Sequence, residues 1–529
     1  MRNTGYFLLP VLVINSVIAS AQDIKEAYNL SNLSVQGTAR SMGFGNALGS
    51  VGGDFSSLSV NPAGIGVYRS SEISITPSLV INGTSSEYTG ATTTDNNTHF
   101  NFNNFGLVIT NAPKGRRYDH RSWKTISFAI GMNRVADFNQ NYTYEGRNNT
   151  SSGSQVFESD ANMNPGNATS VNNSYGSLGY QSYLLNLNAT GQYVSIVPFG
   201  GGVDQLKSEQ TNGGINEYTI SLGGNYKEKL MIGITVDVPV VNYQSSSYYQ
   251  ETLSSDNNSS NPYGFTSFNY SQNLSVTGAG INAKIGAIYK ISDIFRIGAA
   301  FHAPTYYSLT DVSDPAIATV HNDSLVALSV GNGYLAENRF DYNLTTPWKG
   351  VLSGTIILNK LGFITADYEY VDYSSMRYGF PGGVDYSSAT GATFQQEADA
   401  INKQIKKTYK AASDFRLGGE ARIAKYFMAR LGFGYYGNAY TPYGESTANA
   451  YYTTQRIDVS AGFGFHFRHF FTDLGFVHSM YQGYNQPYTV EYNNGAGTSY
   501  VSSGSPATVP TAKINYSLNN VALTLGMKF

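Results

Sequence analysis

The sequence predicts an all-β protein: a 14-stranded antiparallel transmembrane β-barrel with an N-terminal hatch, or plug, in its lumen. Three observations predict this fold. Only 13% of the 529 residues are charged, whereas aromatic residues reach 14% with 42 Tyr, and there are 56 Gly. This composition suits strands better than packed helices. Many segments alternate apolar and polar residues, and the links between these segments alternate between long and short.

The N-terminus predicts export. Arg2 precedes the apolar run 7–14, and Ala19-Ser20-Ala21 follows as a cleavage site, so residues 1–21 are predicted to be a signal peptide. No later run approaches 18 apolar residues, so the mature chain is expected either to be soluble after export or to cross a membrane as a barrel. The absence of cysteine excludes a disulfide scaffold and thiolate chemistry. The net charge of −3 does not favour a nucleic-acid partner.

The alternation has the period of β-strands. In residues 230–238, isoleucines and valines occupy one face, while Gly233, Thr235 and Asp237 occupy the other. Residues 295–302 and 457–467 follow the same pattern. A soluble β-sandwich also alternates, so the connections must discriminate between the two folds.

Fourteen strands are predicted, an even number as in bacterial barrels. Short links at 112–121, 227–228, 290–292, 359, 424–425 and 468 alternate with long polar links at 83–97, 136–213, 243–273, 310–346, 374–409, 441–451 and 482–515. Short periplasmic turns and long external loops are typical of outer-membrane barrels. The strands are predicted at residues 71–82, 98–111, 122–135, 214–226, 229–242, 274–289, 293–309, 347–358, 360–373, 410–423, 426–440, 452–467, 469–481 and 516–529.

The last strand supports outer-membrane insertion. Leu523, Leu525 and Met527 alternate with small or polar residues up to the terminal Phe529, which resembles the signal read by the barrel-assembly machinery. Tyr516 and Leu518 are in the opposite phase, so we expect a β-bulge near residues 519–520.

Charged residues on these strands are assigned to the lumen, because an Arg or Lys facing lipid at the midplane would cost about 2–4 kcal/mol. An ion pathway or paired catalytic carboxylates could use them. We favour a neutralising network that braces the wall and holds a plug. The residues are Asp237, Lys284, Arg296, Asp367, Glu369, Arg416, Glu420 and Arg422, together with Asp458 and Asp473.

Residues 22–70 precede the first strand and are predicted to form the plug, since fourteen strands enclose more space than wall side chains fill. The 136–213 and 374–409 insertions are large enough to carry their own structure. In the second, Phe394, Ala398, Ile401 and Ile405 recur at helical spacing, which predicts a short amphipathic helix over the barrel mouth.

Few residues suggest chemistry. His466 and His469 could ligate haem or a metal only if the turn between them reorients both rings, so interfacial packing is the favoured interpretation. No Ser/His/Asp arrangement stands out. We therefore expect no enzymatic activity, no metal and no cofactor.

The segment before the first strand carries a specific motif. Small residues at 37–49 are followed by Asp54 and then by Asn61-Pro62-Ala63-Gly64. This resembles the hatch of the long-chain fatty-acid transporter (FadL/TodX) family. Residues 300–305 and 367–374 look like the Bacteroidetes branch of that family. In the hatch, Pro presets φ and Asn bonds nearby backbone, so the motif is expected to lock a turn and not to catalyse.

The resemblance implies passive uptake of a hydrophobic small molecule, such as a long-chain fatty acid, by a monomer in the Gram-negative outer membrane among lipid and lipopolysaccharide. It also implies a lateral exit beside a kinked third strand, for which Gly131, Asn133 and Arg134 are candidates. The ligand and the residues that bind it are not identified. The alternatives are a general pore, which would conduct ions, and a structural or adhesive surface barrel.

Overall fold

The computed structural model describes residues 24–489, apart from 114, 164–167, 170–173, 199–200, 258, 332, 334, 336, 382–392 and 443–452, and residues 509–529. The predicted signal peptide, residues 1–21, lies outside the described residues. Within the described ranges, no helix has the length and apolarity to span a membrane.

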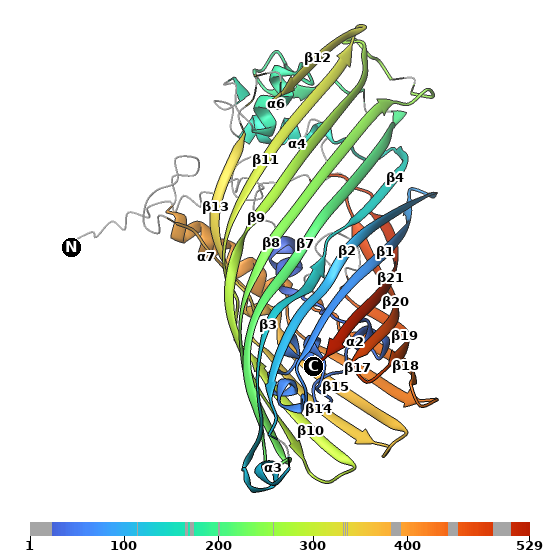
Figure 1. The fold of residues 1–529 in the computed structure, drawn as a ribbon. Coiled ribbons are helices and arrows are strands. Elements are labelled where there is room, and N and C mark those ends of the chain that lie inside the picture. The colour runs from blue at the N-terminus through green and yellow to red at the C-terminus, as the bar shows by residue number, and fades with distance from the viewer. Residues whose placement is uncertain are drawn as a thin grey trace, which may run out of the picture.

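The strands form one closed antiparallel barrel (Figure 1). Each strand pairs with the next, and the first and last pair from Glu72↔Lys528 to Glu87↔Lys513. When each interrupted strand is counted once, the barrel has fourteen strands, which confirms the prediction. In chain order they are β1 (Glu72–Tyr88), β2 (Ala91–Asn111), β3 (Trp123–Asp137) with β4 (Gln140–Asn148), β7 (Val203–Tyr226), β8 (Leu230–Leu253), β9 (Phe265–Lys290), β10 (Phe295–His302) with β11 (Tyr306–His321), β13 (Asn338–Thr345) with β14 (Lys349–Ile357), β15 (Gly362–Asp372) with β16 (Arg377–Gly379), β17 (Ala411–Arg422), β18 (Phe427–Tyr436), β19 (Arg456–His466), β20 (Phe470–Asn485) and β21 (Ala512–Lys528).

One side of the wall is much taller than the other (Figure 1). β7, β8 and β9 have 24, 24 and 26 residues, whereas β14 has 9 and β18 has 10. The prediction of loops at 83–97 and 243–273 was therefore largely wrong, as it was for much of 310–346, where β11 continues and pairs with β12 (Ser324–Ser329). These extensions are rich in Ser, Thr, Tyr and Asn. They lack apolar alternation because neither face needs to contact lipid.

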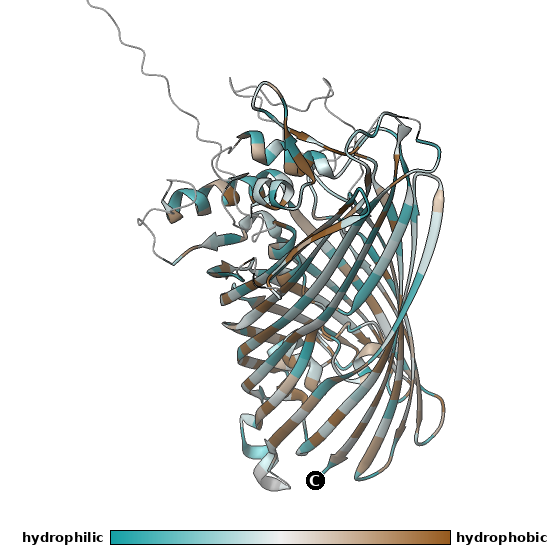
Figure 2. Cartoon of the chain, turned by 90° about the horizontal axis from the view of Figure 1, so that it is seen from above, coloured by the Kyte–Doolittle hydropathy of each residue, from teal (hydrophilic) through white to brown (hydrophobic). Residues whose placement is uncertain are grey.

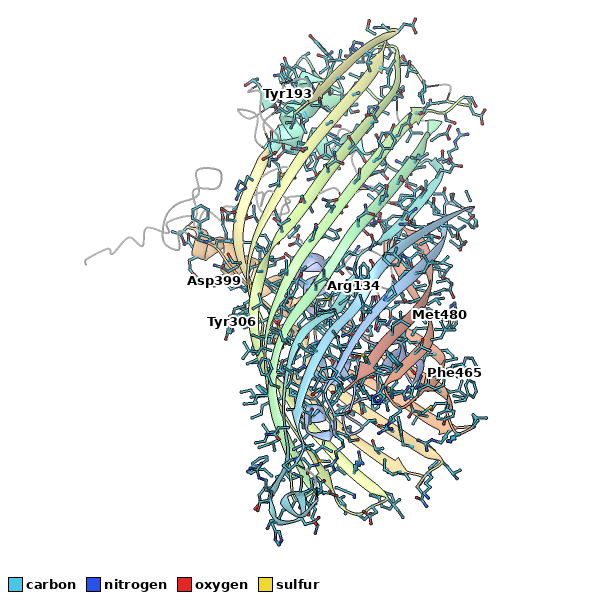
Figure 3. All side chains as sticks on the ribbon, in the orientation of Figure 1. Arg134, Tyr193, Tyr306, Asp399, Phe465 and Met480 are labelled. Carbon is cyan, nitrogen blue, oxygen red and sulfur yellow. The ribbon has the colours of Figure 1, made fainter. Side chains whose placement is uncertain are left out.

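The outer face of the barrel is apolar. On β8, Ile234 and Val236 are exposed, while the intervening Thr235 and the following Asp237 are buried in the lumen. Apolar and polar residues alternate along the barrel strands in Figure 2. Phe465 and Met480 lie on the outside of the wall in Figure 3 and are exposed. The wall therefore presents the surface that lipid contact requires.

The last strand corrects one prediction. β21 pairs with β20 in unbroken register from Met527 to Ala512, so no bulge exists at residues 519–520. Tyr516 and Leu518 change phase because they line an internal cavity, not because the register slips.

Two insertions carry their own structure. The 136–213 insertion contains α4 (Ser154–Met163), α6 (Tyr175–Gln181) and a small sheet of β5 (Leu185–Leu187) and β6 (Tyr193–Ser195), which pack on the tall wall around Phe157, Phe265 and Phe268. The predicted amphipathic helix is α7 (Phe394–Thr408), with Ala398, Ile401 and Ile405 buried. α3 (Arg116–His120) occupies a short-turn link, and η4 (Tyr373–Ser375) follows β15.

The N-terminal segment lies inside the barrel, where Figure 1 shows it in blue behind the wall strands. It contains α1 (Ile24–Ser31), α2 (Ala39–Gly43), η1 (Phe55–Ser59) and η2 (Pro62–Val67), and we call residues 24–70 the hatch. Its contacts with the wall define the candidate site.

Candidate functional site

Asp54 organises the centre of the hatch. Its carboxylate accepts hydrogen bonds from Thr38 Oγ1 at 2.8 and 2.9 Å and caps η1 by accepting one from Ser56 N at 2.9 Å. Arg40 Nη1 lies 3.9 Å away. A short side-chain acceptor at an N-cap satisfies helix donors that would otherwise lack a partner. Asp54 therefore joins the two halves of the hatch.

Asn61 caps η2 and also contacts the wall. Its Oδ1 accepts from Ala63 N at 3.1 Å, and its Nδ2 donates to Gly49 O at 2.6 Å and to Ala287 O of β9 at 3.2 Å. The wall makes room for it at Gly286, where an added Cβ would lie 1.9 Å from Asn61 Oδ1. Pro62 is the first residue of η2, as its fixed φ favours. Gly64 packs against Ser57, where a Cβ would lie 2.4 Å from its Oγ.

Arg40 ties the hatch to the opposite wall. Its Nε lies 3.0 Å from Glu420 Oε2, and Arg430 Nε lies 2.7 Å from the same oxygen. Arg430 Nη1 continues the chain of ion pairs to Asp473 at 2.7 Å. Burial alone would lower the pKa of the Arg40 guanidinium, but the carboxylates of Glu420 and Asp54 more than offset this effect and hold that pKa above its ordinary value.

A second group of charges lies under η1 and η2. Lys284 Nζ lies 2.6 Å from Glu217 Oε1 and 3.0 Å from Asp237 Oδ2. Ser59 of the hatch donates to the same Glu217 oxygen at 2.7 Å, and Asn133 of β3 donates to Ser59 Oγ at 2.9 Å. The third strand, the hatch and the β7–β9 wall are thus linked by consecutive hydrogen bonds.

The third group lies on β15 and β17. Arg416 Nη2 contacts Glu369 at 2.8 Å and Asp367 at 4.0 Å, and Asp367 accepts from Gly49 N of the hatch at 3.0 Å. On β10, Arg296 Nη1 donates to Val51 O of the hatch at 3.4 Å.

Two predicted lumen charges stand apart from these groups. Asp458 pairs with Arg456 at 3.1 Å and lines the cavity described below. Arg422 is exposed, and the described residues give it no ion-pair partner.

The third strand leaves its neighbour. β2 and β3 are paired only up to Asn104↔Asn133, where Asn104 Nδ2 donates to Asn133 Oδ1 at 2.8 Å. Beyond that point the hatch supplies the partners: Ser34 N donates to Val135 O at 2.8 Å and Gln36 N donates to Arg134 O at 2.9 Å. Arg134 Nη2 donates to Gly213 O of β7 at 2.6 Å. Backbone groups freed from the wall are thus satisfied inside it.

Gly131 makes room for a side chain of the hatch. An added Cβ there would lie 2.5 Å from Phe55 Cζ, and one at Gly106 of β2 would lie 2.3 Å from Phe55 Cδ2. The two glycines form a recess in the wall that receives this hatch ring, immediately below the point where the strands part.

β4 continues the inward turn of β3. Its only strand partner among the described residues is β7, and its edge faces side chains on the inner surface of β1 and β2. Thr84 Oγ1 donates to Asn141 O at 2.9 Å, and Thr143 N donates to Asp95 Oδ2 at 2.6 Å. At the kink, Asp137 accepts from His99 Nε2 at 3.0 Å. We call the unpaired interval between β2 and β3–β4, upward from residues 104 and 133, the slot.

A cavity of about 600 Å³ lies above the hatch. Its floor includes hatch residues such as Tyr28 and Met42, and its walls come from β7–β9 and from β18–β21. Residues 135–138 of the third strand also line it, so the cavity reaches the slot. Figure 3 labels Arg134 near the middle of the barrel height. The sequence did not predict the cavity. The shift in apolar alternation at Tyr516 and Leu518 was the signal that could have indicated it, because both residues line the cavity.

The two histidines do not form a shared site. His466 Nε2 lies 3.1 Å from Asp473 Oδ1, whereas His469 Nδ1 lies 3.3 Å from Lys528 O. Within the described ranges, no three His, Cys, Asp or Glu residues are grouped as metal ligands would be.

No protein-family model matches the sequence, and no curated protein matches it. Solved structures do resemble the fold. A Pseudomonas aeruginosa FadL homologue is 12% identical with a TM-score of 0.52, and the alignment covers 94% of this chain and all of that one. The Ralstonia pickettii toluene transporter TbuX is 15% identical (95% and 100% covered, TM-score 0.49), and the Pseudomonas putida toluene transporter TodX is 12% identical (94% and 100%, TM-score 0.47). With its closed barrel, lipid-facing exterior and internal hatch, this chain is a Gram-negative outer-membrane protein with the fold of the FadL homologue.

Proposed function

We propose that the chain is a passive outer-membrane channel for hydrophobic small molecules, which enter the cavity from outside and leave sideways through the slot. The observation that carries this proposal is the contact between the two: residues 135–138, where β3 leaves β2, line the cavity. A molecule in the cavity therefore lies beside an interval of the wall that lacks strand pairing.

The hatch supports a sideways exit because it fills the axial route. Asn61 is bonded to β9 within the recess at Gly286, and Arg40 is ion-paired to β17 on the other side. A lateral exit also suits the chemistry, since an apolar molecule passes into the lipid and avoids the water of the periplasm. The FadL homologue, whose fold the chain shares at a TM-score of 0.52, belongs by its description to the family that the hatch motif resembles.

A reversible bridge across the slot tests the proposal. The natural chain has no cysteine, so D95C/T143C introduces the only pair, at positions where Asp95 Oδ2 and Thr143 N lie 2.6 Å apart. Uptake of labelled butylbenzene and labelled oleate is measured in Gram-negative cells that express the variant. We expect oxidation to slow uptake at least tenfold and reduction to restore it.

The two single-cysteine variants are the matched controls, and their uptake should not respond to oxidant. Unchanged uptake by the bridged variant would reject the lateral exit. No uptake of either compound above the empty-vector level, even by the wild type, would reject the transport proposal altogether. Steady ion conductance of the wild type in planar bilayers would instead favour a general pore.

A further inference from the structure

We infer that three consecutive short turns on the low side of the wall bind the phosphate groups of anionic phospholipids in the periplasmic leaflet of the membrane. These turns contain residues 358–361 between β14 and β15, 422–426 at the junction of β17 and β18, and 467–470 at the junction of β19 and β20, and we call them the basic rim. Figure 1 shows the ends of these strands at the end of the barrel opposite β12, α4 and α6. Short turns lie on the periplasmic side of such barrels. Binding there does not depend on the cargo proposed above.

The basic rim carries cations without acids. Lys360, Arg422, Lys425 and Arg468 are exposed, and the three ranges contain no Asp or Glu. Among the described residues, none of these four cations has an ion-pair partner. The whole chain, in contrast, has 33 Lys and Arg against 36 Asp and Glu. The surplus of positive charge is therefore local, and it includes Arg422, which takes no part in the charge groups of the lumen.

The preceding short turn differs from the basic rim in its charge. Residues 291–294, between β9 and β10, also expose two apolar side chains, Ile291 and Ile294. This turn carries Asp293, however, and Asp293 Oδ1 lies 2.7 Å from Lys290 Nζ. Its charges are balanced within the turn. An unbalanced positive charge is thus not a general consequence of forming a short turn at this end of the barrel.

Exposed apolar side chains accompany the cations in each turn of the basic rim. Leu361, Ile423 and Phe467 are 69%, 64% and 57% exposed. Contact with water would be unfavourable for side chains of this size, whereas contact with lipid would not. A long cationic side chain beside such residues extends from the lipid boundary to the depth of the headgroups. These apolar neighbours favour a lipid surface as the partner over a soluble acidic protein.

Backbone hydrogen bonds join the three turns into one surface. Arg422 N donates to Leu361 O at 2.7 Å, which connects the first turn to the second. His466 N donates to Tyr426 O at 3.0 Å and connects the second turn to the third. The cations of the basic rim therefore act on the same region of the membrane surface.

Aromatic contacts extend this surface between the second and third turns. The rings of Tyr426 and Phe467 stack with their centroids 5.5 Å apart. Lys425 Nζ lies 4.9 Å from the centroid of Tyr426, and Arg468 directly follows Phe467 in the chain. Aromatic rings are favoured at the boundary between lipid and water. The pair thus offers a face for acyl chains, with a cation next to each ring.

The charge of the basic rim selects among phospholipid headgroups. Clusters of Lys and Arg at a membrane surface attract anionic lipids. Phosphatidylglycerol has a phosphate whose negative charge is uncompensated. Phosphatidylethanolamine carries an ammonium group as well, and this group would meet the four cations as a like charge. We therefore expect the basic rim to enrich phosphatidylglycerol.

Competition between these two lipids tests the inference. The purified full chain in detergent is mixed with equimolar phosphatidylglycerol and phosphatidylethanolamine that have the same acyl chains, and the bound lipids are counted by native mass spectrometry. We expect the wild type to bind at least fivefold more phosphatidylglycerol. In K360Q/K425Q/R468Q this preference should fall to twofold or less. The matched control, K403Q/K406Q/K410Q, removes three exposed cations at and beside α7 and should keep the preference of the wild type.

Equal binding of the two lipids by the wild type would overturn the inference and leave the basic rim to an acidic periplasmic protein. An unchanged preference in the rim variant would also overturn it, because the lipid would then bind elsewhere. So would an equal loss in the control, since net charge would be its cause. Heat-modifiable mobility in gels shows whether the triple variant folds. If it does not, the three single variants decide in its place, and each should lose part of the preference.

Discussion

Two parts of the barrel wall differ in the backbone pairing of their strands. β19 and β20 remain paired without interruption from Arg456↔Tyr481 to His466↔Phe471. β2 and β3 part at Asn104↔Asn133, and β3 turns inward. In a membrane every backbone donor and acceptor needs a partner, so a wall can open only where something else provides them. Here the hatch does so at residues 34 and 36.

The difference shows why the hatch and the slot must be considered together. The hatch contacts the wall through Asn61 and Arg40, and residues 34 and 36 of the same segment donate hydrogen bonds to β3 where it leaves β2. Phe55, held in the recess of Gly106 and Gly131, lies at the lower end of the slot. Displacing the hatch should therefore affect both the seal and the wall.

The largest effect is expected from Gly286→Val, which removes the space that Asn61 occupies. A Cβ at Gly286 would lie 1.9 Å from Asn61 Oδ1, and the wall backbone is too constrained by pairing to give way. Overpacking of this kind costs about 1–3 kcal/mol, so we expect the hatch to leave its seat. Single-channel recording should show stable ion conductance that the wild type lacks.

Gly354→Val is the control for that experiment, because a Cβ there meets nothing within 4 Å. It should remain silent in the same recordings. If Gly286→Val folds, by its heat-modifiable mobility in gels, and stays as silent as the control, the hatch is not held at this recess.

Much of this comparison could be predicted from the sequence, but only where lipid imposes a pattern. Alternation predicts the strand count and the outward positions of Ile234 and Val236. It also predicts that Asp237 points inward. Beyond the membrane, alternation of apolar and polar residues is not required. The sequence therefore predicted loops where the extended β7–β9 hairpins lie. Likewise Tyr516 and Leu518 suggested a bulge, because alternation alone cannot reveal that a cavity lies on the inner side.

The candidate site was predicted less completely. The capping residues Asp54 and Asn61 carry a local signal, since both act on helix turns one or two residues away. Arg40 and Ser59 do not, because their partners Glu420 and Glu217 are distant in sequence. The recess that Gly131 offers to Phe55 was not predicted, because only the assembled barrel brings this contact about.

An intermediate effect is expected where the two strands part. Asn133 is fully buried, donates to Ser59 Oγ and accepts from Asn104 Nδ2, so Asn133→Leu removes one buried hydrogen bond from each of these two partners. We expect a loss of about 2 kcal/mol in the free energy of unfolding, measured by urea titration in detergent micelles.

Asn225→Leu on the adjacent strand β7 is a sharp control. Asn225 is equally buried, but its amide nitrogen and oxygen have no hydrogen-bond partner among the described residues. Its replacement should be neutral or stabilising. Equal losses in both variants would mean that the link from β3 to the hatch contributes nothing specific.

The smallest effect is expected at the upper part of the slot, where single side chains hold β4 inside the wall. Thr84→Val keeps the shape of the side chain but removes the donor to Asn141 O, a bond of 2.9 Å. We expect a local loss of about 1 kcal/mol, seen as faster amide hydrogen exchange in residues 140–148 with little change in global stability. Thr94→Val, at an exposed position on β2, should leave this exchange unchanged. If both variants exchange as the wild type does, the inward position of β4 depends on its pairing with β7 alone. The slot would then be a fixed property of the β4–β7 pair, independent of the contacts between β4 and β1.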